Sequence, residues 1–149
     1  MMLKRVIYFL LFILPCTAMA NDIVGKWKTI DDQTGYSRAD VMITKNSDGS
    51  YSGKIIAIRP LPYKPLVETC EKCKGELKGK SYVGLEIMTG FHRSQKDPNE
   101  FQGGHILDPL SGNLYKGKAK LNPTGKRLSM RGYIGVSALG RSTTWIRAD

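Results

Sequence analysis

The chain has 149 residues, of which 41% are hydrophobic and 24% are charged. This composition is ordinary for a folded protein and excludes a wholly disordered chain. No apolar run of about 20 residues follows the N-terminal segment, which excludes an integral membrane protein with helical spans.

The first 20 residues have the pattern of a secretory signal peptide. The basic pair Lys4 and Arg5 precedes an apolar stretch over residues 6–14, which is too short to span a bilayer. The small residues of Ala18-Met19-Ala20 fit a cleavage site. We expect a signal peptide over residues 1–20, one domain over residues 21–149, and export to the bacterial periplasm. Secretion is the alternative destination, and a retained N-terminal anchor is the alternative reading of the segment.

The basic charge favours anionic partners. Loss of Lys4 and Arg5 with the signal would lower the formal net charge from +10 to +8. Outside the cytoplasm this charge favours acidic small molecules or envelope lipids, and nucleic acid is not expected as a partner. The basic residues are scattered, so a solvated basic surface is the alternative. The sequence predicts no oligomeric state.

Short segments rich in β-forming residues alternate with turn signals along the expected domain. Asp48-Gly49 and Asn122-Pro123-Thr124-Gly125 are clear turns, whereas three prolines within residues 59–80 indicate a long loop. We expect eight strands, at residues 23–30, 38–45, 51–58, 81–89, 101–107, 114–121, 127–134 and 141–147.

The strand expected at residues 114–121 has the clearest pattern. Lys116, Lys118 and Lys120 alternate with small or apolar residues, which places one face in water and the other against a core. Eight strands joined by mostly short turns can close into a barrel. The expected fold is therefore all-β, a single antiparallel up-and-down barrel, with a β-sandwich as the alternative.

Cys70 and Cys73 lie in the long loop and are the only cysteines after residue 20. In an oxidising compartment this pair most simply forms a local disulfide. One alternative is a redox pair, because Lys72 and Lys74 could lower a thiol pKa. The other alternative is a metal site. A zinc site needs about four ligands, and the sequence predicts no metal and no cofactor.

The polar candidates for a site come from two strands and the long loop. Arg131 and Tyr133 share one strand face and could anchor a carboxylate or phosphate inside the barrel; alternatively they face water while Met130 and Ile134 face the core. His105 is either a half-buried histidine or a general base. The candidate ligand-binding residues are Arg131, Tyr133, His105, Lys72, Lys74 and Lys78. No catalytic residue is predicted.

The segment Gly25-x-Trp27 resembles the Gly-x-Trp signature of lipocalins and related calycin barrels. The resemblance implies that Trp27 packs at the closed barrel end under an arginine of the last strand. Arg147, or else Arg141, would fill this role, and Trp145 lies between them. Stacking of a guanidinium on an indole is physically favourable.

A second resemblance extends over nearly the whole expected domain. The chain looks like the bacterial domain-of-unknown-function family 2147. The matching segments are Ile23 to Trp27, Cys70-x-x-Cys73-x-Gly75, Gly103-Gly104-x-Ile106-x-Asp108-Pro109, Tyr115-Lys116, Arg131 to Gly135, and Gly140-Arg141-x-x-x-Trp145-x-Arg147. This resemblance implies a small, exported, all-β protein and adds no established activity.

Three functional hypotheses follow. The first is a non-catalytic barrel that binds a small apolar or amphipathic anionic ligand at the end opposite Trp27. The second is an envelope structural or interaction module with a filled core. The third is an enzyme of unknown reaction, although no catalytic motif is legible. An interior cavity would favour the first hypothesis, whereas a packed interior would favour the second.

Overall fold

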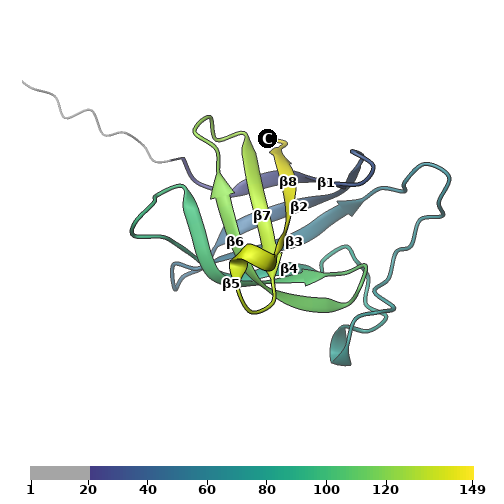
Figure 1. Ribbon diagram of the computed structural model, residues 1–149. Coiled ribbons are helices and arrows are strands. Elements are labelled where there is room, and N and C mark those ends of the chain that lie inside the picture. Colours follow the sequence, from purple (N-terminus) through teal and green to yellow (C-terminus); the bar gives the residue numbers. More distant parts are fainter. Residues whose placement is uncertain (1–20) are drawn as a thin grey trace, which may run out of the picture.

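The computed structural model describes residues 21–149, so the expected signal peptide lies outside the described residues. Each strand pairs antiparallel with its neighbours in the chain, and the last strand pairs with the first, which closes a barrel (Figure 1). This confirms the all-β barrel and excludes the β-sandwich. The strands are β1 (Gly25–Ile30), β2 (Ser37–Lys45), β3 (Tyr51–Ile58), β4 (Glu86–Arg93), β5 (Glu100–Asp108), β6 (Asn113–Leu121), β7 (Arg127–Tyr133) and β8 (Arg141–Arg147).

Two short 3-10 helices interrupt the connections. They are η1 (Gly75–Leu77), between β3 and β4, and η2 (Ser137–Leu139), between β7 and β8. Seven of the strands start and end close to their expected limits. The fourth differs, because residues 81–85 belong to the long loop and β4 runs on to Arg93.

A bulge at Gly90 interrupts the alternation of β4. Met88 lies opposite Gly53, but Phe91 lies opposite Tyr51, so β4 has one residue more than β3 over the same interval. Gly90 occupies a left-handed conformation, with φ of 67°, that accommodates such an insertion. Met88 and Phe91 are both fully buried although they are three residues apart, which obscures the period of two in the sequence.

One half of the barrel, around Phe91, is filled by side chains. On β6, Gly117, Ala119 and Leu121 face the core, and the alternating lysines point outward as expected. A Cβ atom on Gly117 would overlap the ring of Phe91. This mid-strand glycine therefore makes room for a large core side chain.

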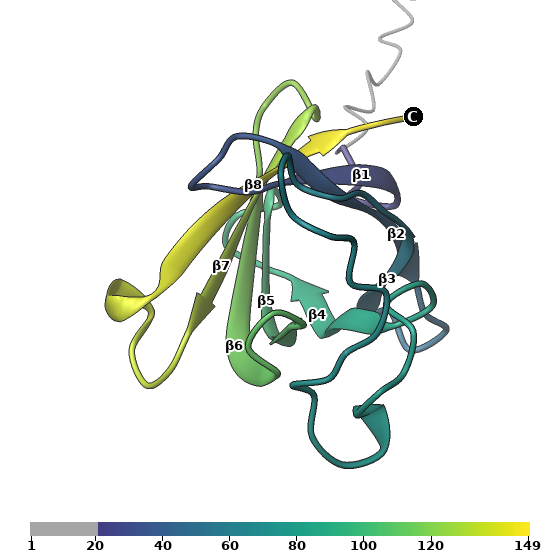
Figure 2. The same ribbon diagram turned by 90° about the vertical axis from the view of Figure 1, so that its right-hand side faces the viewer.

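The two ends of the barrel differ because the strands form a meander. The connections β1–β2, β3–β4, β5–β6 and β7–β8 lie at one end, which we call the mouth. The connections β2–β3, β4–β5 and β6–β7 lie at the other, which we call the closed end. The C-terminus lies beside the β6–β7 turn at the closed end (Figures 1 and 2).

Trp27 and Arg147 seal the closed end. They are partners across the β1–β8 seam, and the guanidinium of Arg147 lies 4.3 Å from the centroid of the Trp27 ring. The indole Nε1 donates to the carbonyl of Ile23 at 2.8 Å, so its polar atom is satisfied in the core. Arg147 also donates to the carbonyls of Gly125 at 2.7 Å and Val24 at 3.0 Å. The resemblance to lipocalins anticipates this arrangement.

We predict that Trp27→Ala lowers the free energy of unfolding by about 3–5 kcal/mol, because it removes a fully buried aromatic ring from the seam. Urea unfolding followed by circular dichroism measures this loss. Leu114→Ala is the control, since Leu114 is 62% exposed and an exposed apolar residue contributes less than about 0.5 kcal/mol. Equal losses in the two variants would contradict the role of Trp27.

Candidate functional site

A cavity of about 800 Å³ occupies the mouth half of the barrel. Its inner wall is mainly apolar and comes from most of the strands. The side chains that form this wall are Ala39, Ile55, Ile87, Ile106, Met130 and Trp145. Thr29 and Thr143 also line it, and the hydroxyl of Thr29 accepts a hydrogen bond from the Ala39 amide at 3.1 Å. The cavity therefore suits an apolar group better than a highly polar one.

Charged side chains gather where the cavity opens, and three of its arginines are already held by acidic partners. Arg141 donates through Nε to Asp32 at 2.8 Å, and this hydrogen bond lowers the pKa of the Asp32 carboxyl. Arg38 pairs with Asp31 at 3.4 Å. Burial tends to raise the pKa of Asp31, but hydrogen bonds from Thr34 and Arg38 outweigh it and the pKa is lowered.

The third arginine, Arg59, pairs with a buried acid. Arg59 Nη2 lies 2.7 Å from a carboxylate oxygen of Asp40, which is 6% exposed. The same guanidinium donates to the hydroxyl of Ser37 at 3.1 Å. Asp40 Oδ1 has no well-aligned hydrogen bond, so the contact is an ion pair in which attraction between charges dominates.

Two lysines at the opening have no such partner. Lys64 and Lys72 line the cavity, and within residues 21–149 neither takes part in an ion pair. Both side chains are exposed. Among the cations that line the cavity, these two remain available to an incoming anionic group.

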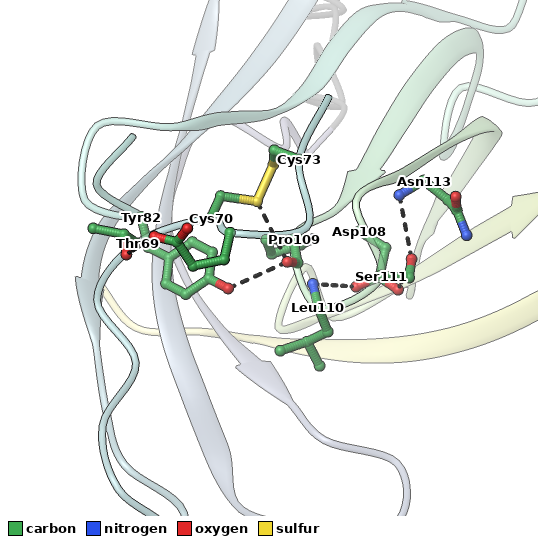
Figure 3. The surroundings of a disulfide bond; sticks show 10 residues. Thr69, Cys70, Cys73, Tyr82, Asp108, Pro109, Leu110, Ser111 and Asn113 are labelled. Carbon is green, nitrogen blue, oxygen red and sulfur yellow. Dashed lines mark hydrogen bonds between the residues drawn. A yellow bond between two sulfur atoms is a disulfide. The ribbon is translucent and has the colours of Figure 1, made fainter. Parts of the chain in front are cut away.

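A disulfide fixes the long loop beside the mouth. Cys70 and Cys73 are bonded and buried, and Cys70 Sγ lies 3.4 Å from the carbonyl oxygen of Pro109 in the β5–β6 turn (Figure 3). The hydroxyl of Tyr82 donates to the same carbonyl at 3.2 Å. Burial raises the pKa of that phenol.

The backbone of this loop also touches the turn directly. A Cβ atom on Gly112 would overlap the carbonyl of Lys72, and Gly112 has a φ of 73°. Leu107 on β5 is buried in the same cluster as the two cysteines. The disulfide-bearing segment therefore covers the outer side of β5 and directs residues 59–72 across the mouth.

The structure separates the candidate residues predicted from the sequence. Lys72 and Tyr133 line the cavity, whereas Lys74 and Lys78 are exposed on the loop beyond it. His105 is exposed on the outer wall, because the ladder between β5 and β6 shifts register after Gln102. Asp108, at the end of the same strand, accepts from the amide of Leu110 and the hydroxyl of Ser111 as part of a turn.

Arg131 also lies outside the cavity lining. Its guanidinium donates to the carbonyls of Ser137 at 2.7 Å and Ala138 at 3.1 Å, and to the hydroxyl of Ser142 at 2.9 Å. Arg131 therefore holds the β7–β8 connection against the barrel. Ile134, which one interpretation placed in the core, is 73% exposed at the mouth.

Sequence reasoning missed several residues of the cavity. Arg38, Tyr115 and Thr143 line it, and Trp145, expected to be only structural, lines it as well. Alternation along β8 offered a signal, because Arg141, Thr143 and Trp145 are spaced to share the inner face. Within residues 21–149 there is no group of three or more His, Cys, Asp or Glu side chains suited to a metal ion.

We predict that Gly112→Ala loosens the long loop, because its new methyl group would overlap the Lys72 backbone. Gly103→Ala is a matched control, since Gly103 also has a positive φ but faces open space. Both variants should lose about 1 kcal/mol of stability from backbone strain. Only Gly112→Ala should speed amide hydrogen exchange across residues 68–80, measured by mass spectrometry. Equal exchange in the two variants would contradict the close packing.

Comparison with known proteins adds a family and a fold. Protein HP1028 from the human pathogen Helicobacter pylori, which is described as belonging to the lipocalin family, superposes with a TM-score of 0.70. The two chains share 17% sequence identity, and the match covers 86% of this chain and 84% of that one. At this identity the similarity shows the barrel fold alone. No curated protein sequence matches.

The described residues contain no helix long and apolar enough to cross a membrane. A family model described as "Uncharacterized protein conserved in bacteria (DUF2147)" matches residues 25–147, from the first residue of β1 to the last residue of β8. The matched segment contains all eight strands, the disulfide and the cavity, and the chain therefore belongs to the DUF2147 family.

Proposed function

We propose that this protein is an exported, non-catalytic binding barrel for a small amphipathic anionic molecule. The apolar part of the ligand would occupy the cavity, and its carboxylate or phosphate would lie among the cations at the mouth. The cavity is the observation that carries this proposal. A barrel of eight strands can fill its interior with side chains, yet this one leaves about 800 Å³ on the mouth side.

The size and lining of the cavity support a lipid-like ligand. Its volume lies within the range of about 300–1,000 Å³ that is usual for small-molecule sites. Ile55, Ile106 and Met130 present apolar surface, while Thr143 and Tyr115 offer few polar groups. Transfer of a hydrocarbon chain from water to such a wall yields about 0.8 kcal/mol for each buried methylene group.

The charges at the mouth support an acidic head group. Lys64 and Lys72 can approach an anion without giving up an existing ion pair, whereas Arg38, Arg59 and Arg141 would have to share theirs. The long loop as a whole carries six cations and three acids, so it has a local excess of positive charge. Such an excess attracts anions from a distance and is weakened by salt.

Export rests on different observations. The pattern of residues 1–20 is that of a cleavable signal peptide, and a disulfide between Cys70 and Cys73 is suited to an oxidising compartment. Together they favour the periplasm as the place where the barrel folds and meets its ligand. Envelope lipids and fatty acids are the amphipathic anions of that compartment.

We predict that protein expressed from the full sequence and recovered from periplasm has the mass of a chain that begins at Asn21. Native mass spectrometry should show a bound molecule that is lost on denaturation and contains a fatty acyl chain. A chain that retains its first 20 residues would contradict the cleavable signal. Recovery without any bound molecule, together with no binding in the titration below, would contradict the ligand.

We predict that narrowing the cavity abolishes ligand binding. Thr143→Phe puts a bulky ring into the cavity, whereas Thr144→Phe puts the same ring on the outer face of the same strand. Titration calorimetry with a long-chain fatty acid on delipidated protein should show at least a tenfold loss of affinity for Thr143→Phe only. In the parent protein, the emission of Trp145 should change on binding. Unaltered binding to Thr143→Phe would place the ligand elsewhere.

A further inference from the structure

Exposed apolar side chains gather at one end of the barrel. Apart from Val24, Ile56 and Leu114, every exposed large hydrophobic side chain within residues 21–149 lies in a connection at the mouth. They are Tyr36, Tyr63, Leu66, Val67, Leu110, Ile134, Val136 and Leu139, together with Leu77 and Val83, which lie farther along the long loop beside Lys54 and Glu86. The turns at the closed end, residues 46–50, 94–99 and 122–126, contain none of them. The barrel is therefore amphipathic along its axis.

The most exposed of these side chains stand on two separate connections. Tyr63 is 106% exposed and is the one non-glycine residue with positive φ, at 62°, in the described part of the chain. Across the opening, Val136 is 61% and Leu139 is 82% exposed. The hydrogen bonds from Arg131 to the carbonyls of Ser137 and Ala138 hold this second connection in place. Tyr63 and the side chains of the β7–β8 connection are therefore held by segments with a defined backbone conformation.

Both connections border the same opening. Leu66 and Val67 from the long loop, and Ile134 and Leu139 from the β7–β8 connection, all line the cavity. Figure 2 shows the β7–β8 connection at the lower left and the long loop descending from the end of β3 to the lower right. The apolar surface of the mouth is therefore continuous with the apolar lining of the cavity.

We propose that the mouth docks onto an anionic phospholipid bilayer. Tyr63, Leu66 and Val67 on one side, and Ile134, Val136 and Leu139 on the other, would enter the interfacial region of the membrane. Lys64 and Lys72 line the same opening and would face lipid phosphates. Tyrosine is favoured at this interface because its ring is apolar and its hydroxyl is polar.

Charge complementarity favours a bilayer over a protein partner. The β7–β8 connection, residues 134–140, has no charged side chain, and the long loop has its excess of cations. Glu68 and Glu71 lie in the same loop, but its six cations outnumber its three acids. Apolar side chains beside a net positive charge match a layer of hydrocarbon beneath anionic head groups. A folded protein bound to these exposed apolar side chains would close the cavity, whereas a bilayer contains the kind of molecule that the cavity suits.

The docking deepens the proposed function, because it would let a lipid-like ligand pass between bilayer and cavity without crossing water. Ligand binding and docking nevertheless use different residues. Tyr63 and Val136 do not line the cavity, and Thr143 is not among the exposed apolar side chains of the mouth. The two proposals can therefore fail independently.

Sedimentation with vesicles tests the docking. Protein expressed from the full sequence should bind vesicles of phosphatidylglycerol and phosphatidylethanolamine more tightly than vesicles of phosphatidylcholine alone. The double variant Tyr63→Ser/Val136→Ser should lose at least tenfold in vesicle affinity, because it removes two apolar anchors. Lys64→Gln and Lys72→Gln should each lose about fivefold, and less at high salt.

The controls separate docking from folding and from ligand binding. Val24→Ser changes an exposed apolar residue at the closed end, and Thr143→Phe narrows the cavity; both should dock as the parent protein does. The double variant should still bind a fatty acid in solution. As a second measurement, Tyr63→Trp should shift its emission to the blue with anionic vesicles.

Three results would overturn the docking proposal. The first is equal vesicle binding by the double variant and Val24→Ser. The second is unchanged Tyr63→Trp emission in the presence of anionic vesicles. The third is a dimer of the parent protein that is absent in the double variant, since the exposed apolar side chains would then form a protein interface. Loss of fatty acid binding by Thr143→Phe, with docking intact, supports both proposals.

Discussion

The barrel depends on the contact between Trp27 and Arg147, because this contact lies on the seam that closes the sheet. The two residues are partners between β1 and β8, and their side chains stack at 4.3 Å across the closed end. Arg147 also ties the backbone of Val24 and Gly125 to the seam. Once this end is filled, space that the core does not use can remain only toward the mouth. The position of the cavity is thus a consequence of where the indole lies.

Glycine and small residues decide which half is filled. In the closed half, Gly104 and Gly117 lack side chains, and the ring of Phe91 takes their place. In the mouth half, Ala39 and Thr143 are small, but no large side chain crosses to meet them, and the space persists. The disulfide contributes differently. A disulfide that closes a loop as short as that between Cys70 and Cys73 stabilises the fold by about 2 kcal/mol. Its main effect is therefore to shape the segment at the opening.

Much of the fold could be predicted because local signals agreed with the final structure. Lys116, Lys118 and Lys120 alternate without interruption, and the expected limits of their strand are nearly those of β6. The pattern of the fourth strand was harder to interpret because Gly90 inserts one residue. A single insertion inverts the faces that alternation assigns to the residues beyond it. Arg131 could not be assigned from sequence, since its partners are carbonyls of a later connection whose path no pattern encodes.

The cavity and the exposed apolar side chains occur together at the mouth because the barrel is amphipathic along its axis. Exposed apolar side chains such as Tyr63, Val136 and Leu139 favour aggregation, and polar turns like those at the closed end would avoid this hazard. An unfilled interior likewise forgoes packing that would stabilise the fold. Both costs are confined to the same end, where Lys64 and Lys72 also lack ion-pair partners among the described residues. A cavity that receives molecules from a bilayer needs this combination, because its opening must meet hydrocarbon and anionic head groups together.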